Sequence, residues 1–372
     1  MSAQTLDLLE TPAAVVDLGR MERNLQRAAE YTAQHGLALR PHVKTHKSPL
    51  IAVEQLRLGA VGLTCATPME AEVMSQVCND LLVAYPPVGS ARAARIARLA
   101  ERAKVTVALD SERAIADIAA AAKEAGVTVG VYVELDLGMH RVGVPDAASA
   151  VALARRVIAE PSLEYRGLAF YPGHVREAVS DQDAALRALS ESLGSALDEL
   201  ARADVAPKVV SGGSTPTLWR SHEIKGVTEI RPGTYVFNDR TTAAVGACER
   251  DDCALTVLAT VVSTAVPGQA VIDAGTKALG REPMRGVEGE GFGALRDRPE
   301  VVVARMSEEH GILDLARTDW RPRVGDRVRV IPNHVCIVVH LNDLVYGVRG
   351  ATVERSWRVE ARGRGQLEIA SA

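Results

Sequence analysis

The feature that most constrains the fold is a regular alternation of strand and helix signals between residues 39 and 230. Helix-start pairs such as Ser48-Pro49 and Thr67-Pro68, and helix-stop residues such as Gly126, separate one unit from the next. The strands expected between them are 39–44, 61–66, 81–85, 105–109, 127–135, 167–171, 208–210 and 227–230. Strands that are apolar throughout and separated by helices are typical of a parallel sheet buried on both faces. We therefore predict an α/β fold with a (β/α)8 TIM barrel; an open doubly wound sheet is the alternative, but eight repeats favour closure.

The pattern changes after about Phe237. Turn signals such as Gly268 and Gly325-Asp326 separate short apolar runs without convincing long helices between them. The expected strands are 255–263, 270–274, 301–306, 311–315, 327–331 and 337–341. We predict a smaller all-β domain, with the barrel over residues 20–237 and the β domain over 1–19 and 238–372.

Composition limits the partners and the compartment. Hydrophobic residues make up 47% and charged residues 24% of the 372 residues, which is typical of a globular protein with a proper core. The net charge of -4 leaves no broad cationic face, so we expect no nucleic acid and no anionic membrane as a partner. The N-terminus does not resemble a signal peptide, no apolar run approaches a membrane span, and the five cysteines are few and odd in number. These features predict a cytoplasmic protein.

The polar residues at the end of the first barrel strand form the first candidate site. The stretch LALRPHVKTHK, residues 37–47, would place Arg40, His42 and Lys44 on one face of a strand. Neighbouring cations favour a neutral amine on whichever lysine is most buried, and Schiff-base chemistry with an aldehyde cofactor needs such an amine. The alternative is a solvated basic strand end.

The ends of the other strands predict an anion site. The seventh strand ends in Ser211, Gly212, Gly213, Ser214 and Thr215, and the eighth in Arg231, Gly233, Thr234 and Tyr235. Glycines let backbone N–H groups approach an anion, hydroxyls add donors, and a following helix presents its N-terminus. An N-capped turn is the alternative. A phosphate anchor at the same barrel end as a strand-end lysine predicts pyridoxal phosphate.

Two further strand ends supply Arg141 and Tyr171. Arg141 and Arg231 are fixed cations for a phenolate, carboxylate or ring nitrogen, or else ordinary ion-pairing residues. Tyr171 and His174 could act as acid or base near the cofactor, or could be hydrogen-bonded core groups.

One motif stands out in the β domain, Pro332-Asn333-His334-Val335-Cys336. On a strand, His334 and Cys336 would face the same way and form a nitrogen–sulfur pair that suits zinc. Two protein ligands leave positions for water and substrate, so such a site would be catalytic. The alternative is core packing.

Taken together, the motifs RPHVKTHK, LDLGMHRVG, FYPGH, SGGSTPT, RPGTYVF and PNHVC resemble the metal-activated fold-type III pyridoxal phosphate enzymes. These are the D-threonine aldolase and eukaryotic-type D-serine dehydratase family, distant relatives of alanine racemase. The resemblance spans almost the whole chain, in order. It implies an alanine racemase-like barrel plus β domain, and a homodimer whose active site lies between the barrel of one subunit and the β domain of its partner.

The resemblance also implies roles for particular residues. Lys44 would be the Schiff-base lysine, Tyr171 and Arg141 would lie beside the cofactor ring, and His334 and Cys336 would hold the metal. Gly213, Ser214, Gly233 and Thr234 would bind phosphate. A His-x-Cys pair resembles the zinc-dependent dehydratases, whereas many aldolases of the family carry His-x-Asp with manganese or magnesium; thiolate softness also favours zinc. Ile337 and Val338 depart from the family's frequent Cys-Pro-Thr, so we expect the substrate pocket near the metal to differ from that of the family.

The resemblance thus implies a lyase that acts on a D-β-hydroxy amino acid. Dehydration of a D-serine or D-threonine type of substrate to a 2-oxo acid and ammonia is the first expectation. Retro-aldol cleavage to glycine and an aldehyde is the first alternative. An amino-acid racemase, which would need a second base and no metal, and a non-catalytic pyridoxal phosphate carrier are the others.

Overall fold

A computed structural model describes residues 4–284, 289–363 and 365. The chain divides into two compact units, each described here by itself. The β unit comprises Met1–Arg27 and Thr234–Glu360, and the barrel unit comprises Ala28–Gly233 with the segment after residue 360. Among the described helices, none combines the length and apolarity needed to cross a membrane.

The barrel unit is built on an eight-stranded sheet in which every pairing is parallel. Its strands are β3 (Ala38–Leu39), β4 (Leu63–Cys65), β5 (Asp80–Val83), β6 (Lys104–Leu109), β7 (Val129–Glu134), β8 (Leu163–Ala169), β9 (Val209–Gly212) and β10 (Glu229–Ile230). The order runs β3-β10-β9-β8-β7-β6-β5-β4. The chain just after β3 then bonds back to β4, because Thr64 N donates to Pro41 O and Val43 N donates to Thr64 O, both at 2.9 Å. These bonds close the ring and confirm the predicted barrel over the open sheet.

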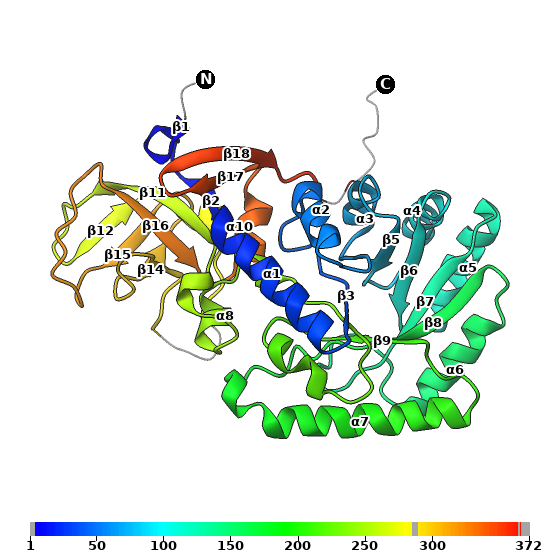
Figure 1. The fold of residues 1–372 in the computed structure, drawn as a ribbon. Coiled ribbons are helices and arrows are strands. Elements are labelled where there is room, and N and C mark those ends of the chain that lie inside the picture. The colour runs from blue at the N-terminus through cyan, green and yellow to red at the C-terminus, as the bar shows by residue number, and fades with distance from the viewer. Residues whose placement is uncertain (1–3, 285–288, 364, 366–372) are drawn as a thin grey trace, which may run out of the picture. The chain divides into compact units, whose positions relative to one another are not determined.

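Helices follow the barrel strands and lie outside the sheet (Figure 1). They are α2 (Pro49–Arg57), α3 (Pro68–Met74), α4 (Ser90–Ala100), α5 (Glu112–Ala125), α6 (Ala147–Ile158) and α7 (Asp183–Arg202), with 3-10 helices η2 (Val179–Asp181) and η3 (Leu218–Glu223). Local signals set their ends: the Thr67 side chain accepts from Glu70 N, and Gly126 ends α5 in the left-handed conformation. α1 (Leu18–Gln34) precedes β3.

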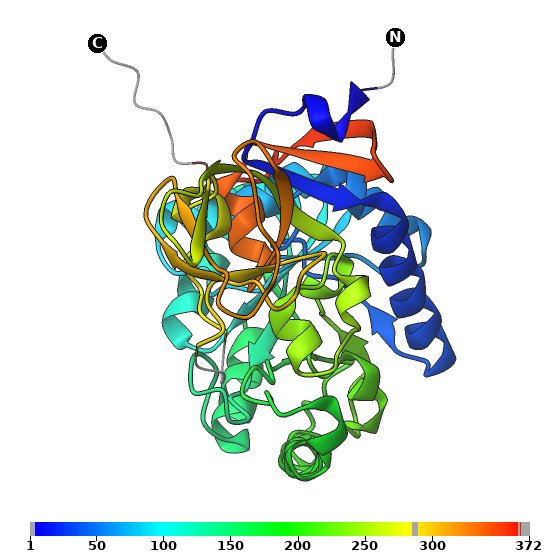
Figure 2. The ribbon, with the colours of Figure 1, turned by 90° about the vertical axis from the view of Figure 1, so that its left-hand side faces the viewer.

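The β unit holds mostly antiparallel strands (Figure 2). They are β1 (Gln4–Thr5), β2 (Ala13–Asp17), β11 (Leu255–Ser263), β12 (Gln269–Ile272), β13 (Gly293–Leu295), β14 (Val303–Met306), β15 (Gly311–Asp314), β16 (Arg327–Pro332), β17 (Leu344–Arg349) and β18 (Thr352–Arg358). The order is β1-β18-β17-β2-β11-β12-β15-β14, and β16 pairs with β11 and β13. Among the described strands of this unit, only the β17–β2 pairing is parallel. Short helices join them: η1 (Leu6–Leu8), η4 (Thr234–Val236), α8 (Arg240–Ala244), η5 (Arg250–Asp252), α9 (Thr276–Leu279) and α10 (Val335–Leu341).

The strand predicted over residues 337–341 is wrong, because these residues belong to helix α10. A run rich in β-branched residues favours a strand by local preference. However, Val335, Val338 and Val339 are buried at helical spacing, so tertiary packing of one helix face overrides that preference. Strands β1, β13, β17 and β18 were not predicted.

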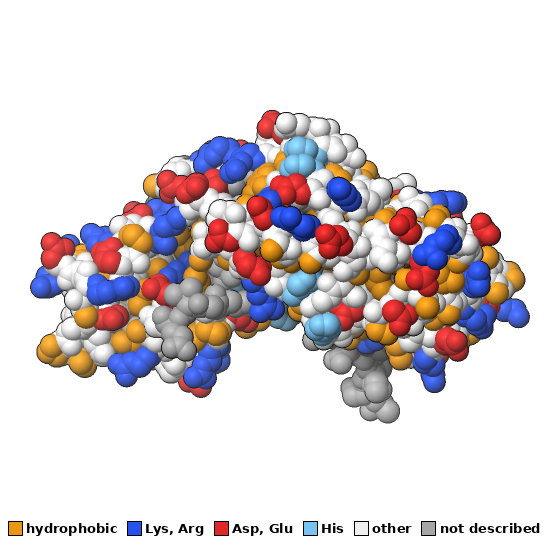
Figure 3. All heavy atoms as spheres, turned by 90° about the horizontal axis from the view of Figure 1, so that it is seen from below, with side chains coloured by type: hydrophobic (Ala, Val, Ile, Leu, Met, Phe, Trp, Pro, Cys, Tyr) orange, Lys and Arg blue, Asp and Glu red, His pale blue; other side chains and the backbone are white. Residues whose placement is uncertain are grey.

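The surface carries charges of both signs. On the face shown in Figure 3, acidic and basic side chains are interspersed among apolar and uncharged groups. Such a face offers no extended field of one sign.

Candidate active site

Lys44 lies in a turn beyond the end of β3, not in a strand as predicted. β3 ends at Leu39, His42 makes a single bridge to Thr64, and Lys47 N donates to Val43 O at 2.7 Å to close the turn. Pro41 has no N–H with which to continue the ladder, which explains why the strand stops early. The turn places Lys44 at the C-terminal end of the barrel strands, where active sites of such barrels are found.

The two lysines of this segment have different surroundings. Lys47 is the more buried, and its Nζ forms a buried ion pair with Glu70 Oε1. Lys47 therefore has a buried carboxylate partner. In the described part of the chain, the Lys44 ammonium has no such carboxylate partner, and its Nζ lies 6.0 Å from the centre of the Tyr171 ring. Lys44 is thus the amine that remains available for chemistry.

Arg141 approaches the same tyrosine from the loop that follows β7. Its Cζ lies 4.9 Å from the centre of the Tyr171 ring. The Asp136 carboxylate organises this loop by accepting hydrogen bonds from Gly138 N and His140 N, both at 3.0 Å. Loops that follow β3, β7 and β8 therefore bring Lys44, Arg141 and Tyr171 together within the barrel unit.

Ser211 and Arg231 belong to a buried polar network inside the barrel. Arg231 donates from Nη1 to Ser211 Oγ at 2.5 Å and from Nη2 to Phe170 O at 2.9 Å. Ser211 Oγ in turn donates to Glu229 Oε1 at 2.6 Å, and Glu229 Oε2 accepts from Arg40 Nε at 2.7 Å. Burial lowers the pKa of Arg231, while Glu134 and Glu229 oppose that shift. The Ser211 hydroxyl is thus engaged with the protein, and Arg40 is paired inside the barrel.

The loops after β9 and β10 contain glycines at positions where a side chain would be strained or crowded. Gly213 has φ 86°, a conformation that favours glycine, and a Cβ at Gly233 would lie 2.9 Å from Thr45 Oγ1. Ser214 and Thr215 are buried, and the Ser214 hydroxyl lies 3.1 Å from Thr217 Oγ1. The helix expected to follow this loop is the 3-10 helix η3, which begins at Leu218.

Two more predicted residues, Thr234 and Tyr235, start the β unit in η4, where Tyr235 is buried.

His42 is held as a neutral imidazole. Burial lowers its pKa well below the ordinary value, and the charges of Lys44, Arg231 and Lys47 lower it further. Its Nδ1 accepts a hydrogen bond from Lys44 N at 3.4 Å. A neutral ring next to the Lys44 backbone adds no positive charge to the site.

His46 gives this segment a measurable pH dependence. Burial lowers its pKa to about 4, and its ring bonds Gln55 Oε1 and Ser48 N. Below the unfolded value of about 6.5, the unfolded chain binds a proton that the folded chain does not, so stability falls as the pH approaches 4. We expect the loss to have a slope of up to about 1.4 kcal/mol per pH unit from this residue. Denaturant unfolding of His46→Gln should show a shallower loss over this range; an unchanged slope would contradict the role of His46.

His334 and Cys336 lie at the start of α10, so the predicted strand geometry is wrong, although their side chains do interact. His334 is the N-cap residue with φ −144°, and Cys336 lies in the first turn. The Cys336 thiolate raises the pKa of His334 to about 11; burial opposes this rise, and a hydrogen bond with Asp239 adds to it. Among the residues described, no third His, Cys, Asp or Glu completes a metal-binding group with this pair. An imidazole nitrogen and a thiolate sulfur held together are ligand types that bind divalent transition-metal ions.

Sequence reasoning missed Asp239. Its Oδ2 lies 3.1 Å from His334 Nδ1, and its carboxylate is fully buried. The available signal was a helix start: Asp239 is the N-cap residue of α8, with Thr242 completing a capping box. That pattern predicts the local cap, but the contact with a residue 95 positions away depends on the fold.

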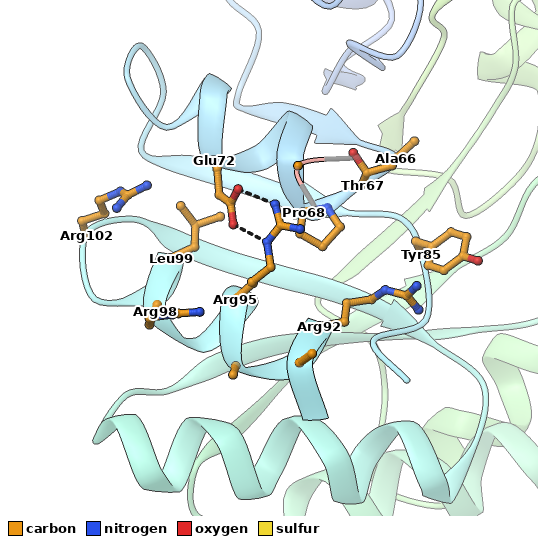
Figure 4. A pocket seen from close by; sticks show the side chains of 13 residues that line it. Ala66, Thr67, Pro68, Glu72, Tyr85, Arg92, Arg95, Arg98, Leu99 and Arg102 are labelled. Atoms are coloured by element: carbon orange, nitrogen blue, oxygen red, sulfur yellow. Dashed lines mark hydrogen bonds and ion pairs between the residues drawn. The ribbon is translucent and has the colours of Figure 1, made fainter. Parts of the chain in front are cut away.

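A cavity of about 750 Å³ lies between α3 and α4 of the barrel unit (Figure 4). Arginines from one face of α4 line it, and the Arg95 guanidinium is held by both oxygens of Glu72 at 2.6 and 2.7 Å. None of the residues predicted for the site lines this cavity within the described chain.

Comparisons with known proteins match the chain along most of its length. Residues 16–241 match the alanine racemase N-terminal domain, and residues 254–348 match a putative serine dehydratase domain. The D-threo-3-hydroxyaspartate dehydratase of Delftia sp. (strain HT23) is 37% identical over 89% of this chain and 92% of its own length.

Two solved structures extend the comparison. D-threonine aldolase from Filomicrobium marinum has a TM-score of 0.90 and 32% identity, covering 98% of this chain and 99% of that chain. A cysteine-to-alanine variant of D-threo-3-hydroxyaspartate dehydratase, described as the metal-free form, has a TM-score of 0.88 and 32% identity. That match covers 98% of this chain and 100% of the other.

Proposed function

We propose that this chain is a pyridoxal phosphate- and metal-dependent lyase of D-β-hydroxy amino acids. The chain belongs to the alanine racemase N-terminal domain family, and its relatives include a dehydratase and a D-threonine aldolase. Its preferred reaction is dehydration to a 2-oxo acid and ammonia. The observation that carries this preference is Cys336 beside His334. A His-x-Cys pair resembles the zinc-dependent dehydratases, and a thiolate ligand selects zinc over harder ions.

The residues of the barrel unit fit pyridoxal phosphate. Lys44, whose ammonium has no carboxylate partner among the described residues, would carry the cofactor, and Arg141, Tyr171 and His42 would lie around its ring. Arg231, fixed by Ser211, would face the same space. The phosphate would be held by the loop residues Gly212, Gly213, Ser214, Thr215, Gly233, Thr234 and Tyr235. In this assignment the barrel domain, residues 20–237, binds the cofactor.

Bound pyridoxal phosphate would supply an electron sink for the negative charge that develops at the α-carbon. The Lys44 amine would take the α-proton as the general base. Tyr171 and Arg141 would orient the ring, and the fixed charge of Arg141 would attract the substrate carboxylate. His334 and Cys336, in the β domain over residues 1–19 and 238–372, would hold the zinc ion. Zinc would supply Lewis-acid polarisation of the β-hydroxyl; manganese or magnesium would suit the thiolate less well.

The products separate the candidate reactions. We expect the purified protein with zinc to convert D-threonine to 2-oxobutyrate and ammonia, D-serine to pyruvate and ammonia, or D-threo-3-hydroxyaspartate to oxaloacetate and ammonia. Chelation should abolish this turnover and added zinc should restore it. Glycine with an aldehyde product would assign the retro-aldol reaction, which the aldolase relative supports. Racemisation that survives chelation, or bound cofactor without turnover, would contradict a metal-dependent lyase.

Two further features belong to the proposal. The family resemblance supports a homodimer with the active site at the subunit interface, which sedimentation of the holoenzyme tests. The five cysteines are free in the structure, which is compatible with a reducing cytoplasm.

A further inference from the structure

Asp239 binds two segments of the β unit that are far apart in the sequence. Its Oδ1 accepts hydrogen bonds from Thr242 N at 2.9 Å and Thr242 Oγ1 at 3.0 Å. Its Oδ2 lies 3.1 Å from His334 Nδ1 and accepts a hydrogen bond from Val335 N at 3.2 Å. The side chain has no exposed surface. A buried carboxylate that is held by four such contacts has a fixed orientation: Oδ1 faces Thr242, and Oδ2 faces the His334 ring and Val335 N.

We propose that Asp239 is a positioning residue that holds His334 as the Nδ1–H tautomer, so that Nε2 offers its lone pair to the metal. This inference rests on the proposed function of His334 and Cys336 as metal ligands. An imidazole that ligates through one nitrogen needs its other N–H fixed by an acceptor, and a carboxylate also makes the ring a stronger donor to the metal. Because Nδ1 faces Oδ2 at 3.1 Å, Nε2 is the ring nitrogen left for the metal. The His334 side chain is about one-third exposed, in contrast to the buried Asp239 behind it.

The position of the loop does not depend on Asp239 alone. Arg240 Nη1 donates to Asn333 Oδ1 at 2.8 Å, and Thr241 Oγ1 donates to Asn333 O at 2.7 Å. Asn333 is buried, and its Nδ2 donates to Gly291 O at 2.8 Å. Residues 239–241 therefore bind residues 333–335 by several bonds, and most of these survive a change at Asp239. A substitution there can alter the ring without releasing the loop.

The substitution Asp239→Asn separates ring positioning from helix capping. Asparagine is as good an N-cap as aspartate, so its oxygen can keep the bonds to Thr242. Its amide group then faces His334 Nδ1, where two donors would meet, and the ring must move its hydrogen to Nε2. Val335 N also loses its acceptor. We expect the zinc Kd to rise by about 10–100-fold, the usual effect of losing such a partner.

Zinc affinity is measured on the full-length protein by competition with a chromophoric chelator, so the readout does not depend on turnover. Thr242→Ala is the matched control, because it removes the side-chain half of the capping box and leaves the Oδ2 contacts in place. We expect its zinc Kd to equal that of the wild type. Equal affinity in Asp239→Asn and wild type would overturn the proposal. A similar loss in both variants would also overturn it, because it would assign Asp239 a capping role only.

The tautomer is a second readout that does not require the metal. Cys336→Ala removes the thiolate that favours a doubly protonated ring, so histidine ¹⁵N shifts in this background report the neutral ring at a pH above its pKa. We expect hydrogen on Nδ1 of His334 with Asp239 present and on Nε2 after Asp239→Asn. Hydrogen on Nε2 in both proteins would overturn the inference. If the wild-type protein binds no zinc but this exchange of tautomers is found, the proposed metal site fails while the positioning by Asp239 stands.

Discussion

Lys44→Ala is expected to lose the covalent link to pyridoxal phosphate and nearly all turnover. Residues 37–47 contain two lysines, and Lys47 is paired with Glu70. Among the described residues, the Lys44 ammonium has no carboxylate partner. Both Lys44 and Arg141 approach the Tyr171 ring. Removing a residue that acts as both attachment point and general base should lower kcat by at least about 10²–10⁴-fold. The measurements are the rate of 2-oxo acid formation and the absorbance of the lysine-linked cofactor.

Lys47→Arg provides the control for this variant. It keeps a positive charge beside the buried Glu70, so the ion pair can persist and the cofactor link should remain. Borohydride reduction of the wild-type holoenzyme, followed by peptide mass analysis, identifies the modified lysine directly. Reduced cofactor attached to Lys47, or full turnover in Lys44→Ala, would contradict the assignment of Lys44.

Cys336→Asp is expected to change the metal requirement. The substitution replaces a soft thiolate with a hard carboxylate next to His334, so zinc affinity should fall while manganese and magnesium become better suited. With zinc as the added metal, we expect turnover to fall by about 10²–10⁴-fold, because a Lewis-acid ion contributes several kcal/mol. Manganese should restore part of the activity in Cys336→Asp, whereas Cys336→Ala should respond to neither metal.

Cys78→Ala controls for the general effect of losing a cysteine. Cys78 is buried in the barrel unit, where its Sγ donates to Asp80 O. This variant should keep the wild-type metal response, with at most a loss of stability from the cavity. Unchanged zinc dependence in Cys336→Asp would show that Cys336 is not a metal ligand. The product mixture of Cys336→Asp, analysed in the same experiment, shows whether the metal alone decides between loss of ammonia and release of glycine.

Local sequence signals predict the barrel and the barrel end at which the proposed site lies. Apolar strands, helix caps such as Thr67 and stop residues such as Gly126 are local signals, and local sequence fixes them. Parallel strands in a closed barrel place their C-terminal ends together, so Lys44, Arg141 and Tyr171 could be expected near one another from their positions after three strands. The motifs also identified the family.

The contacts between individual side chains depend on the three-dimensional arrangement of distant segments. Lys44 and Lys47 lie three positions apart, and the difference between them is Glu70, which reaches Lys47 from the start of α3. Residues 337–341 favour a strand by composition but form a helix because one face of α10 is buried. The sequence pattern predicts Asp239 as a local helix cap, yet one oxygen of its carboxylate contacts the ring of His334 and the first residue of α10. In each case the deciding contact joins distant segments, and local sequence preferences carry no information about contacts of that range.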